Sequence, residues 1–375
     1  MDQENTNQKK TIPDDVIRLQ LTYKGLTEFP DYLLTENVYK AVNLLYLGRN
    51  LISKLPENFG NLSSLTGLFI NHNKLQHLPE AISCLDNLQS LNLTGNELLE
   101  LPDSLRKLKK LQKLEICNNQ LTKLPSGIGN LLALRILEVA NNNLTTVPTE
   151  LSNCEHLETL NLDNNRLIFL PRQFRKLGCL CELSAAKNNL YALPQEIGRN
   201  ECFKSLYVDN NQSLYSLPSS VNGKDVGFFR CAEVLLPAEI LDHFPHVNIQ
   251  HTLTEKLSIL LPPELQQVLN MQSCVPSLLE LALRVASDNI HHTDIKEAIP
   301  FNLWSLMECS TSCCEECKKD IFLSAFPVVL KKHTHSQYIL GMCCSLNCVK
   351  KFHQHSFLPL VYPSLEDMCL ALMPI

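Results

Sequence analysis

Residues 111–125 read LQKLEICNNQLTKLP, in which apolar positions, an asparagine and a leucine-proline pair follow one another at fixed steps. In an extended segment Leu114 and Ile116 face one side, while Glu115 between them faces the other. Prolines preceded by an apolar residue recur along the chain with six consecutive spacings of 23 residues. Asparagines keep the same step at Asn50, Asn73, Asn96, Asn119, Asn142, Asn165, Asn188 and Asn211. A fixed period of this length indicates a solenoid in which each repeat adds one short strand to a curved parallel sheet.

The turn after each proline is equally regular. Apolar residues stand three positions after it, at Phe59, Ile82, Leu105, Ile128, Leu151, Phe174 and Ile197, and six positions after it, at Leu62, Leu85, Leu108, Leu131, Cys154 and Leu177. We expect them to pack the convex side as a short helical turn. Cys154 replaces a leucine and is interpreted as a core thiol rather than a reactive one. The asparagines are expected to hydrogen-bond the backbone of neighbouring repeats.

Over about residues 16–230 this pattern resembles the 23-residue Leu-Pro class of intracellular leucine-rich repeats. The resemblance implies an α/β solenoid, a curved horseshoe of about nine repeats spanning residues 16–234. Residues 1–15 are predicted to be disordered. With strands about 4.8 Å apart, nine repeats form a concave face on the order of 40 Å wide, which suits a folded domain or a long peptide.

The concave face carries the residues between the two inner apolar positions of each strand: Gln20, Tyr46, Phe69, Asn92, Glu115, Glu138, Asn161, Ser184 and Tyr207. Exposed aromatic residues are enriched among interface hot spots. Farther along, Glu115, Glu138, Asp163, Glu182 and Asp209 make the face acidic. The predicted target-binding residues are Tyr46, Phe69, His72, Glu115, Glu138 and Tyr207. They suit a protein that offers an apolar anchor and basic residues; the alternative is a solvated sheet with scattered apolar side chains.

The overall composition favours a protein partner. A formal net charge of −6 and a pI near 6.1 provide no broad cationic field, which disfavours binding to nucleic acid or an anionic membrane. The N-terminal residues lack the apolar stretch of a secretory signal, and no segment has the length of a membrane span. The expected location is therefore cytoplasmic, with the nucleus as an alternative. In such a reducing compartment the 16 cysteines are expected as thiols or metal thiolates.

A second domain is predicted over residues 235–375, where the repeat period stops. Its pattern suggests a small helical domain in which Pro262, Pro263 and Pro276 delimit two helices. The second helix, residues 277–286, is apolar on more than one stripe and is therefore expected to be buried on two sides.

This helix resembles the elongin-binding box of cullin-RING substrate receptors. A small residue, a leucine, a second small residue and an aliphatic residue occur at that spacing in Ser277, Leu278, Ala282 and Ala286. Downstream, Ile299, Pro300 and Leu303 resemble the cullin-two box. The resemblance implies that Leu278 enters a pocket on elongin C, with elongins B and C and a cullin as partners.

Two cysteine pairs, Cys314 with Cys317 and Cys344 with Cys348, flank a predicted hairpin around residues 326–340. Four thiolates suit a tetrahedral structural zinc, which leaves no position for a catalytic water. The zinc-knuckle module is placed at about residues 309–355. Cys313, Cys343, His333 and His335 stay open as alternative ligands, and paired thiols without metal are a further alternative.

The function predicted from these features is a protein-protein interaction module, in particular a cullin-RING substrate receptor whose concave face binds its target. The alternative is a signalling scaffold whose C-terminal domain is only a zinc-stabilised cap. An enzyme is not expected, because the chain has no Gly-rich phosphate loop and no nucleophile-base spacing. Basic residues such as Lys318 and Lys350 lack an aromatic stacking platform for nucleic acid.

Overall fold

The computed structural model of the chain describes residues 17–35, 41–231, 310–321, 324–334 and 337–343. It also describes strands at 246–250, 256–260 and 267–268 and single residues at 283, 348 and 351.

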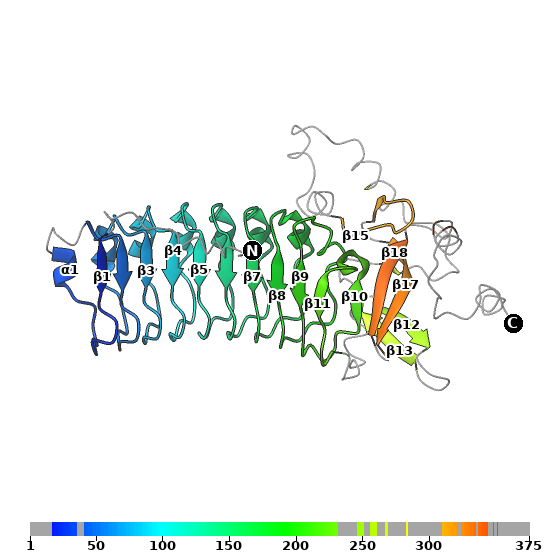
Figure 1. Cartoon of the computed structure of the whole chain (residues 1–375), viewed down its shortest axis with the longest axis horizontal. Helices are drawn as coiled ribbons and strands as arrows, with labels where there is room; N and C mark the ends of the chain where they lie inside the picture. The colour runs from blue at the N-terminus through cyan, green and yellow to red at the C-terminus, as the bar shows by residue number, and fades with distance from the viewer. Residues whose placement is uncertain are drawn as a thin grey trace, which may run out of the picture.

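The core of the structure is a ten-stranded parallel sheet in which each strand pairs with the equivalent strand of the next repeat (Figure 1). The strands are β1 (Arg18–Gln20), β2 (Leu44–Tyr46), β3 (Gly67–Phe69), β4 (Ser90–Asn92), β5 (Lys113–Glu115), β6 (Ile136–Glu138), β7 (Thr159–Asn161), β8 (Glu182–Ser184), β9 (Ser205–Tyr207) and β11 (Asp225–Gly227). The expected curved solenoid is confirmed. The sheet has one strand more than the nine counted repeats, because β11 adds to β9 in register.

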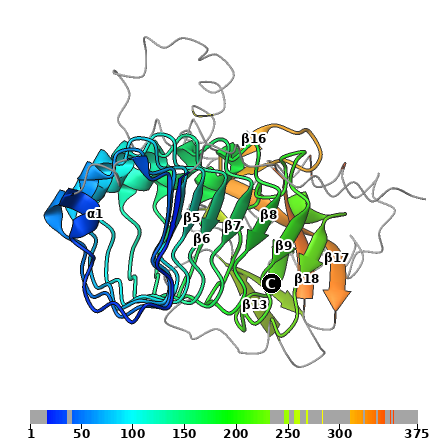
Figure 2. The same cartoon turned by 60° about the vertical axis from the view of Figure 1, so that its left-hand side comes forward.

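Short 3-10 helices form the opposite wall, so the chain coils between strand and turn (Figure 2). They are η2 (Glu57–Asn61), η3 (Glu80–Cys84), η4 (Asp103–Lys107), η5 (Ser126–Asn130), η6 (Thr149–Asn153) and η7 (Arg172–Lys176). Each follows one of the periodic prolines, whose fixed φ and missing N–H suit the start of a helical turn. The apolar residues predicted for these turns are buried, Cys154 included. Before η2, α1 (Tyr32–Thr35) occupies the same wall.

The recurring asparagines hold neighbouring repeats together. Asn119 is buried; its Nδ2 donates to the carbonyl of Leu93 at 3.1 Å and to that of Ile116 at 3.1 Å. Its Oδ1 accepts from the N–H of Leu98 at 3.0 Å. The residue before it, Asn118, has φ 55°, a left-handed conformation that asparagine tolerates. The predicted role of the asparagine ladder is therefore confirmed.

Beyond the repeats, the described segments are mostly strands. A four-stranded sheet has the order β10 (Ser216–Pro218), β18 (Gln337–Cys343), β17 (Ser324–Thr334) and β14 (Gln267–Val268). β12 (His246–Gln250) pairs with β13 (Lys256–Leu260), and β15 (Ser312–Cys313) pairs with β16 (Asp320–Ile321). β17 and β18 form the predicted hairpin.

The prediction of a helical second domain was wrong for the described residues 246–250, 256–260 and 267–268, which form strands. In β12 and β13, apolar and polar residues alternate with period two, as in Val247, Asn248 and Ile249. This period favours strands over helices. Among the described residues, no helix is long and apolar enough to cross a bilayer.

Candidate functional site: the concave face and the cysteine cluster

An aromatic pair lies on the concave face at the N-terminal end of the sheet. Tyr46 in β2 and Phe69 in β3 are register partners, and their rings stack with centroids 4.7 Å apart and planes 7° apart. Leu45 and Leu68 precede them in the same strands, point the opposite way and are buried. The two predicted residues are thus brought together, each partly exposed to solvent.

Gly67 and Leu44 complete this aromatic platform, and sequence reasoning missed both. A Cβ at Gly67 would lie 2.6 Å from Leu44 Cδ2 and 3.0 Å from Phe69 Cε2. The missing side chain therefore lets the Phe69 ring lie flat along the strand. The available signal was their position two residues before the aromatics, which places them on the same strand face.

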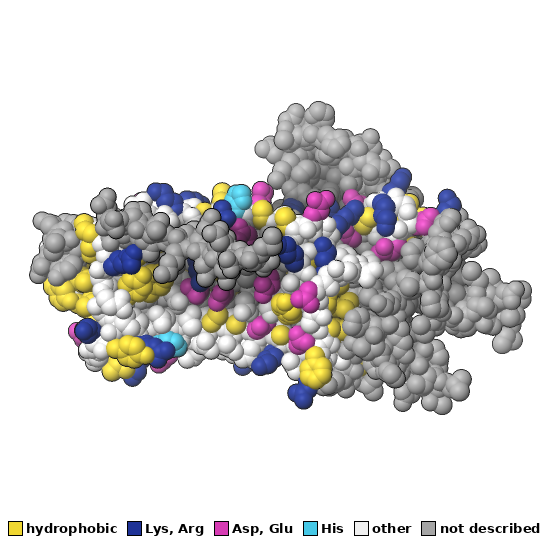
Figure 3. All heavy atoms as spheres, viewed as in Figure 1, with side chains coloured by type: hydrophobic (Ala, Val, Ile, Leu, Met, Phe, Trp, Pro, Cys, Tyr) yellow, Lys and Arg dark blue, Asp and Glu magenta, His cyan; other side chains and the backbone are white. Residues whose placement is uncertain are grey.

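An acidic patch lies farther along the same face. Glu115 in β5 and Glu138 in β6 are register partners. Lys113 pairs with Glu115 at 3.0 Å, whereas Glu138 has no hydrogen-bond or ion-pair partner among the described residues. Asp163 is held by the fold, because its Oδ1 accepts from Ser184 Oγ at 2.6 Å and from a backbone N–H. In Figure 3, acidic side chains gather near the middle of this face and hydrophobic ones toward its N-terminal end.

The Cys117 thiol lies close enough to three carboxylates of the acidic patch for them to shift its pKa. Burial, together with the carboxylates of Glu138, Glu115 and Asp163, raises the pKa of its thiol to about 11, although a backbone hydrogen bond opposes them. Three carboxylates therefore act on one point of the concave face. Their summed field attracts cationic groups of a partner.

The other two predicted target-binding residues are His72 and Tyr207. His72 is exposed in the turn after β3, and its ring lies against Gly95 of the next repeat. Tyr207 lies in β9, six strands from Phe69, which corresponds to about 29 Å. Its hydroxyl bonds Asp225 at 3.0 Å. The structure does not bring Tyr207 into one site with Tyr46, because equivalent positions of distant repeats cannot meet on an extended sheet.

The cysteine cluster contains three of the four predicted metal ligands. The sulfur atoms of Cys314, Cys317 and Cys348 all lie within 4.8 Å of one another. Cys344 lies outside the described residues. The buried thiol of Cys343 hydrogen-bonds Cys314, and this contact and burial raise its pKa. Three thiols that converge in this way are suited to bind a metal ion that prefers sulfur.

The segment carrying the cysteines packs on the convex wall of the last repeats. β18 pairs with β10 in parallel, and the Ser219 hydroxyl donates to the Glu315 carboxylate. Arg175 donates to the Ser310 hydroxyl, which itself bonds Asp320 at 2.7 Å. Sequence reasoning missed these contacts, because no local pattern links residues so far apart in the chain.

Equivalent residues of the convex wall are exposed in the earlier repeats and buried in the repeats on which this segment packs. The residue directly after the proline is exposed in the earlier repeats, at Glu57, Glu80, Asp103, Ser126 and Thr149. In the later repeats the equivalent residues, Arg172 and Gln195, are buried.

A pocket of about 420 Å³ lies between the segment and the wall. It is lined by Glu196, Arg199, Cys313, Glu315 and Lys318, among others. Its charges pair internally, Arg199 with Glu196 at 2.8 Å and Lys318 with Glu315 at 3.8 Å.

The residues predicted to bind elongin and cullin lie outside the described residues; they are Ser277, Leu278, Ala282, Ala286, Ile299, Pro300 and Leu303. His335 also lies outside them, and only the backbone of His333 is described. Within this stretch Leu283 is helical and buried.

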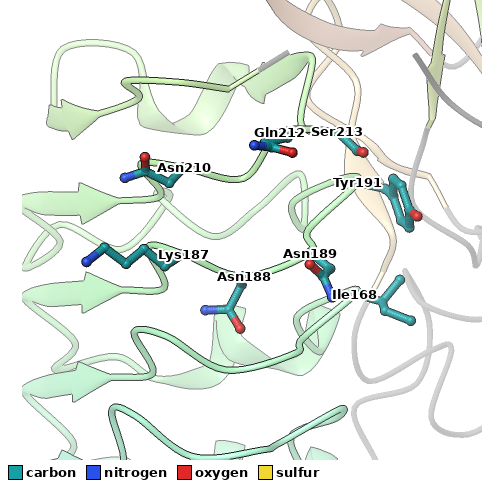
Figure 4. Close-up of a pocket in the computed structure, with 8 residues that line it drawn as sticks. All are labelled: Ile168, Lys187, Asn188, Asn189, Tyr191, Asn210, Gln212 and Ser213. Atoms are coloured by element: carbon teal, nitrogen blue, oxygen red, sulfur yellow. The ribbon is translucent and has the colours of Figure 1, made fainter. Parts of the chain in front are cut away.

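A further pocket of about 390 Å³ lies in the turns that follow the last strands (Figure 4). Lys187, Asn210 and Gln212 contribute polar groups, and Tyr191 and Ile168 lie at one end. Asn188 also lines it, but its amide already bonds the backbone. The lining has no carboxylate and no histidine, so it offers no acid-base pair of the usual kind.

A family profile described as leucine rich repeat matches residues 40–98, 109–167 and 133–190. All the matched residues lie in the repeat region, whose parallel, in-register strands are similar to those of leucine-rich-repeat proteins.

The similar solved structures include the following three. A leucine-rich-repeat protein of Leptospira interrogans shares 28% identity over 60% of this chain and 64% of that chain, with a TM-score of 0.48. The leucine-rich-repeat ectodomain of the membrane receptor kinase GASSHO1/SCHENGEN3 from Arabidopsis thaliana, in complex with CASPARIAN STRIP INTEGRITY FACTOR 2, shares 27% over 54% and 29%, with a TM-score of 0.46. An internalin from Listeria monocytogenes shares 20% over 57% and 61%, with a TM-score of 0.49. This chain spans less than two thirds of each.

Proposed function

We propose that the protein binds a protein partner on its concave face and has no catalytic role. The stacked pair Tyr46–Phe69 carries this proposal. Two aromatic rings are already stacked against each other on the concave face, and the carboxylates of Glu115 and Glu138 lie farther along the same face. The partner accordingly presents an apolar anchor to the rings and basic residues to Glu115 and Glu138.

The test compares proteins that co-purify with the wild-type chain and with Tyr46→Ala/Phe69→Ala. The matched control is Leu99→Ala/Leu132→Ala, which removes two exposed apolar side chains away from the strands. A set of proteins lost from the aromatic variant and kept by the control supports the proposal. An unchanged set, with both variants folded by circular dichroism, refutes it.

The finer proposal is a cullin-RING substrate receptor. Its support is the resemblance of Ser277, Leu278, Ala282 and Ala286 to an elongin box and of Ile299, Pro300 and Leu303 to a cullin box. Purified elongin B–elongin C complex should co-elute with the full chain. Leu278→Ala should weaken this association by about one to two powers of ten, because a leucine buried in a partner pocket contributes roughly 1.5–3 kcal/mol. Absence of co-elution with the wild-type chain refutes the receptor role.

The alternative is a scaffold whose C-terminal part is a metal-stabilised cap. One observation favours it: β18 extends a sheet from β10, and Glu315 and Asp320 face the convex wall. In this proposal zinc is structural and is bound by Cys314, Cys317, Cys344 and Cys348. Native mass spectrometry should detect one zinc ion, and Cys317→Ser should lose it; metal content unchanged by Cys317→Ser contradicts the assignment.

A further inference from the structure

The dimensions of the concave face limit what it can bind. Its strands have three residues each, so the flat part of the sheet is about 10 Å tall along the strands. This height matches one extended chain laid across the strands. A folded domain would in addition have to contact the turns on either side.

The two chemical features of the face lie at a defined separation. The aromatic pair spans β2 and β3, and the two glutamates span β5 and β6, three strand spacings farther along. Three spacings correspond to about 14 Å. Glu138 in β6 is half a spacing farther, about 17 Å from the middle of the aromatic pair, which is the length of about five residues of an extended chain.

The two glutamates are not equivalent. Glu115 already pairs with Lys113 at 3.0 Å, whereas Glu138 has no ion-pair partner in the described part of the chain. A cationic side chain of the partner therefore has its most favourable electrostatic interaction with Glu138, because no lysine among the described residues competes for that carboxylate. Asp163 adds to the field, but its Oδ1 is already occupied by Ser184 Oγ and the Ala186 N–H.

We propose that the partner contributes one extended segment with an aromatic or large aliphatic anchor and an arginine or lysine about five residues away, the anchor on Tyr46–Phe69 and the cation on Glu138. The inference rests on the proposed function of the concave face and adds the chemistry and spacing of its ligand. Leu44, whose Cδ2 lies over Gly67 beside the Phe69 ring, provides further apolar surface for the anchor. The charges of the face exclude segments with an acidic residue at that spacing.

The experiment selects binders from a random-peptide phage library on the immobilised full chain. Recovered peptides should share the anchor and the cation at this spacing, and a synthetic consensus peptide is then titrated against variants. Glu138→Gln should weaken binding several-fold and more than Glu115→Gln does. Glu138→Lys should weaken it by about tenfold or more and select peptides with an acidic residue instead.

The outcomes separate this inference from the proposed function. Binding lost in Tyr46→Ala/Phe69→Ala but equal in Glu138→Lys refutes the motif and leaves the face as a binding surface. Peptides with the cation at about twice the spacing also refute it. Selected peptides that bind the aromatic variant as well as wild type refute the proposed function. No enrichment at all refutes a single extended segment as ligand.

Discussion

Asn119→Ala tests how the repeats that carry the acidic patch are held together. The side chain accepts from the Leu98 N–H at 3.0 Å and donates to the carbonyls of Leu93, Ile116 and Cys117. Removing it affects these groups differently. Every carbonyl keeps another donor, since Leu93 also accepts from Asn96, Ile116 from Asn142 and Cys117 from the Gly95 N–H.

The Leu98 N–H is therefore the only one of the four groups left without a partner. An unsatisfied buried group costs about 1–3 kcal/mol, and three weakened carbonyl interactions add to it. We expect the free energy of unfolding to fall by about 2–4 kcal/mol.

Urea unfolding followed by far-UV circular dichroism measures this change, provided that the slope with denaturant stays constant. The matched control is Asn118→Gly. Asn118 is exposed with φ 55°, a conformation that glycine adopts freely, so this variant should change stability by no more than about 0.5 kcal/mol. Equal stabilities of the two variants would refute the idea that the buried amide joins the repeats.

Three further predictions concern the cysteines. Burial raises the pKa of the Cys154 thiol to about 11. At pH 8, iodoacetamide should therefore modify the exposed Cys84 and spare Cys154, as measured by peptide mass spectrometry. Comparable modification rates at the two cysteines would contradict the packing of Cys154. Because the folded-state pKa is raised, the stabilising effect of the protonated Cys154 thiol is complete below pH 9 and is lost as the pH rises toward 11, a loss that Cys154→Val should abolish. Zinc chelation, or Cys317→Ser, should increase hydrogen exchange in residues 310–321 and 216–221 and leave exchange in residues 57–153 unchanged. An equal increase in hydrogen exchange along the whole chain would contradict a local cap.

The positions of the strands, the buried asparagines and the turns after each proline could be read from periodicity. In a solenoid each repeat contacts only its neighbours, so a local pattern such as Leu114, Ile116 and Asn119 already specifies what its side chains touch. The aromatic pair follows for the same reason, because equivalent positions of adjacent repeats become register partners.

Contacts between distant segments depended on tertiary structure. Nothing near Glu315 or Asp320 in the sequence indicates that they meet Ser219 and Arg175, and the convergence of Cys348 with Cys314 requires the whole β17–β18 hairpin to return. The limit has a physical origin. Periodicity reports which face of an element is buried, whereas the partner of that face is selected by packing and pairing energies summed over the folded chain.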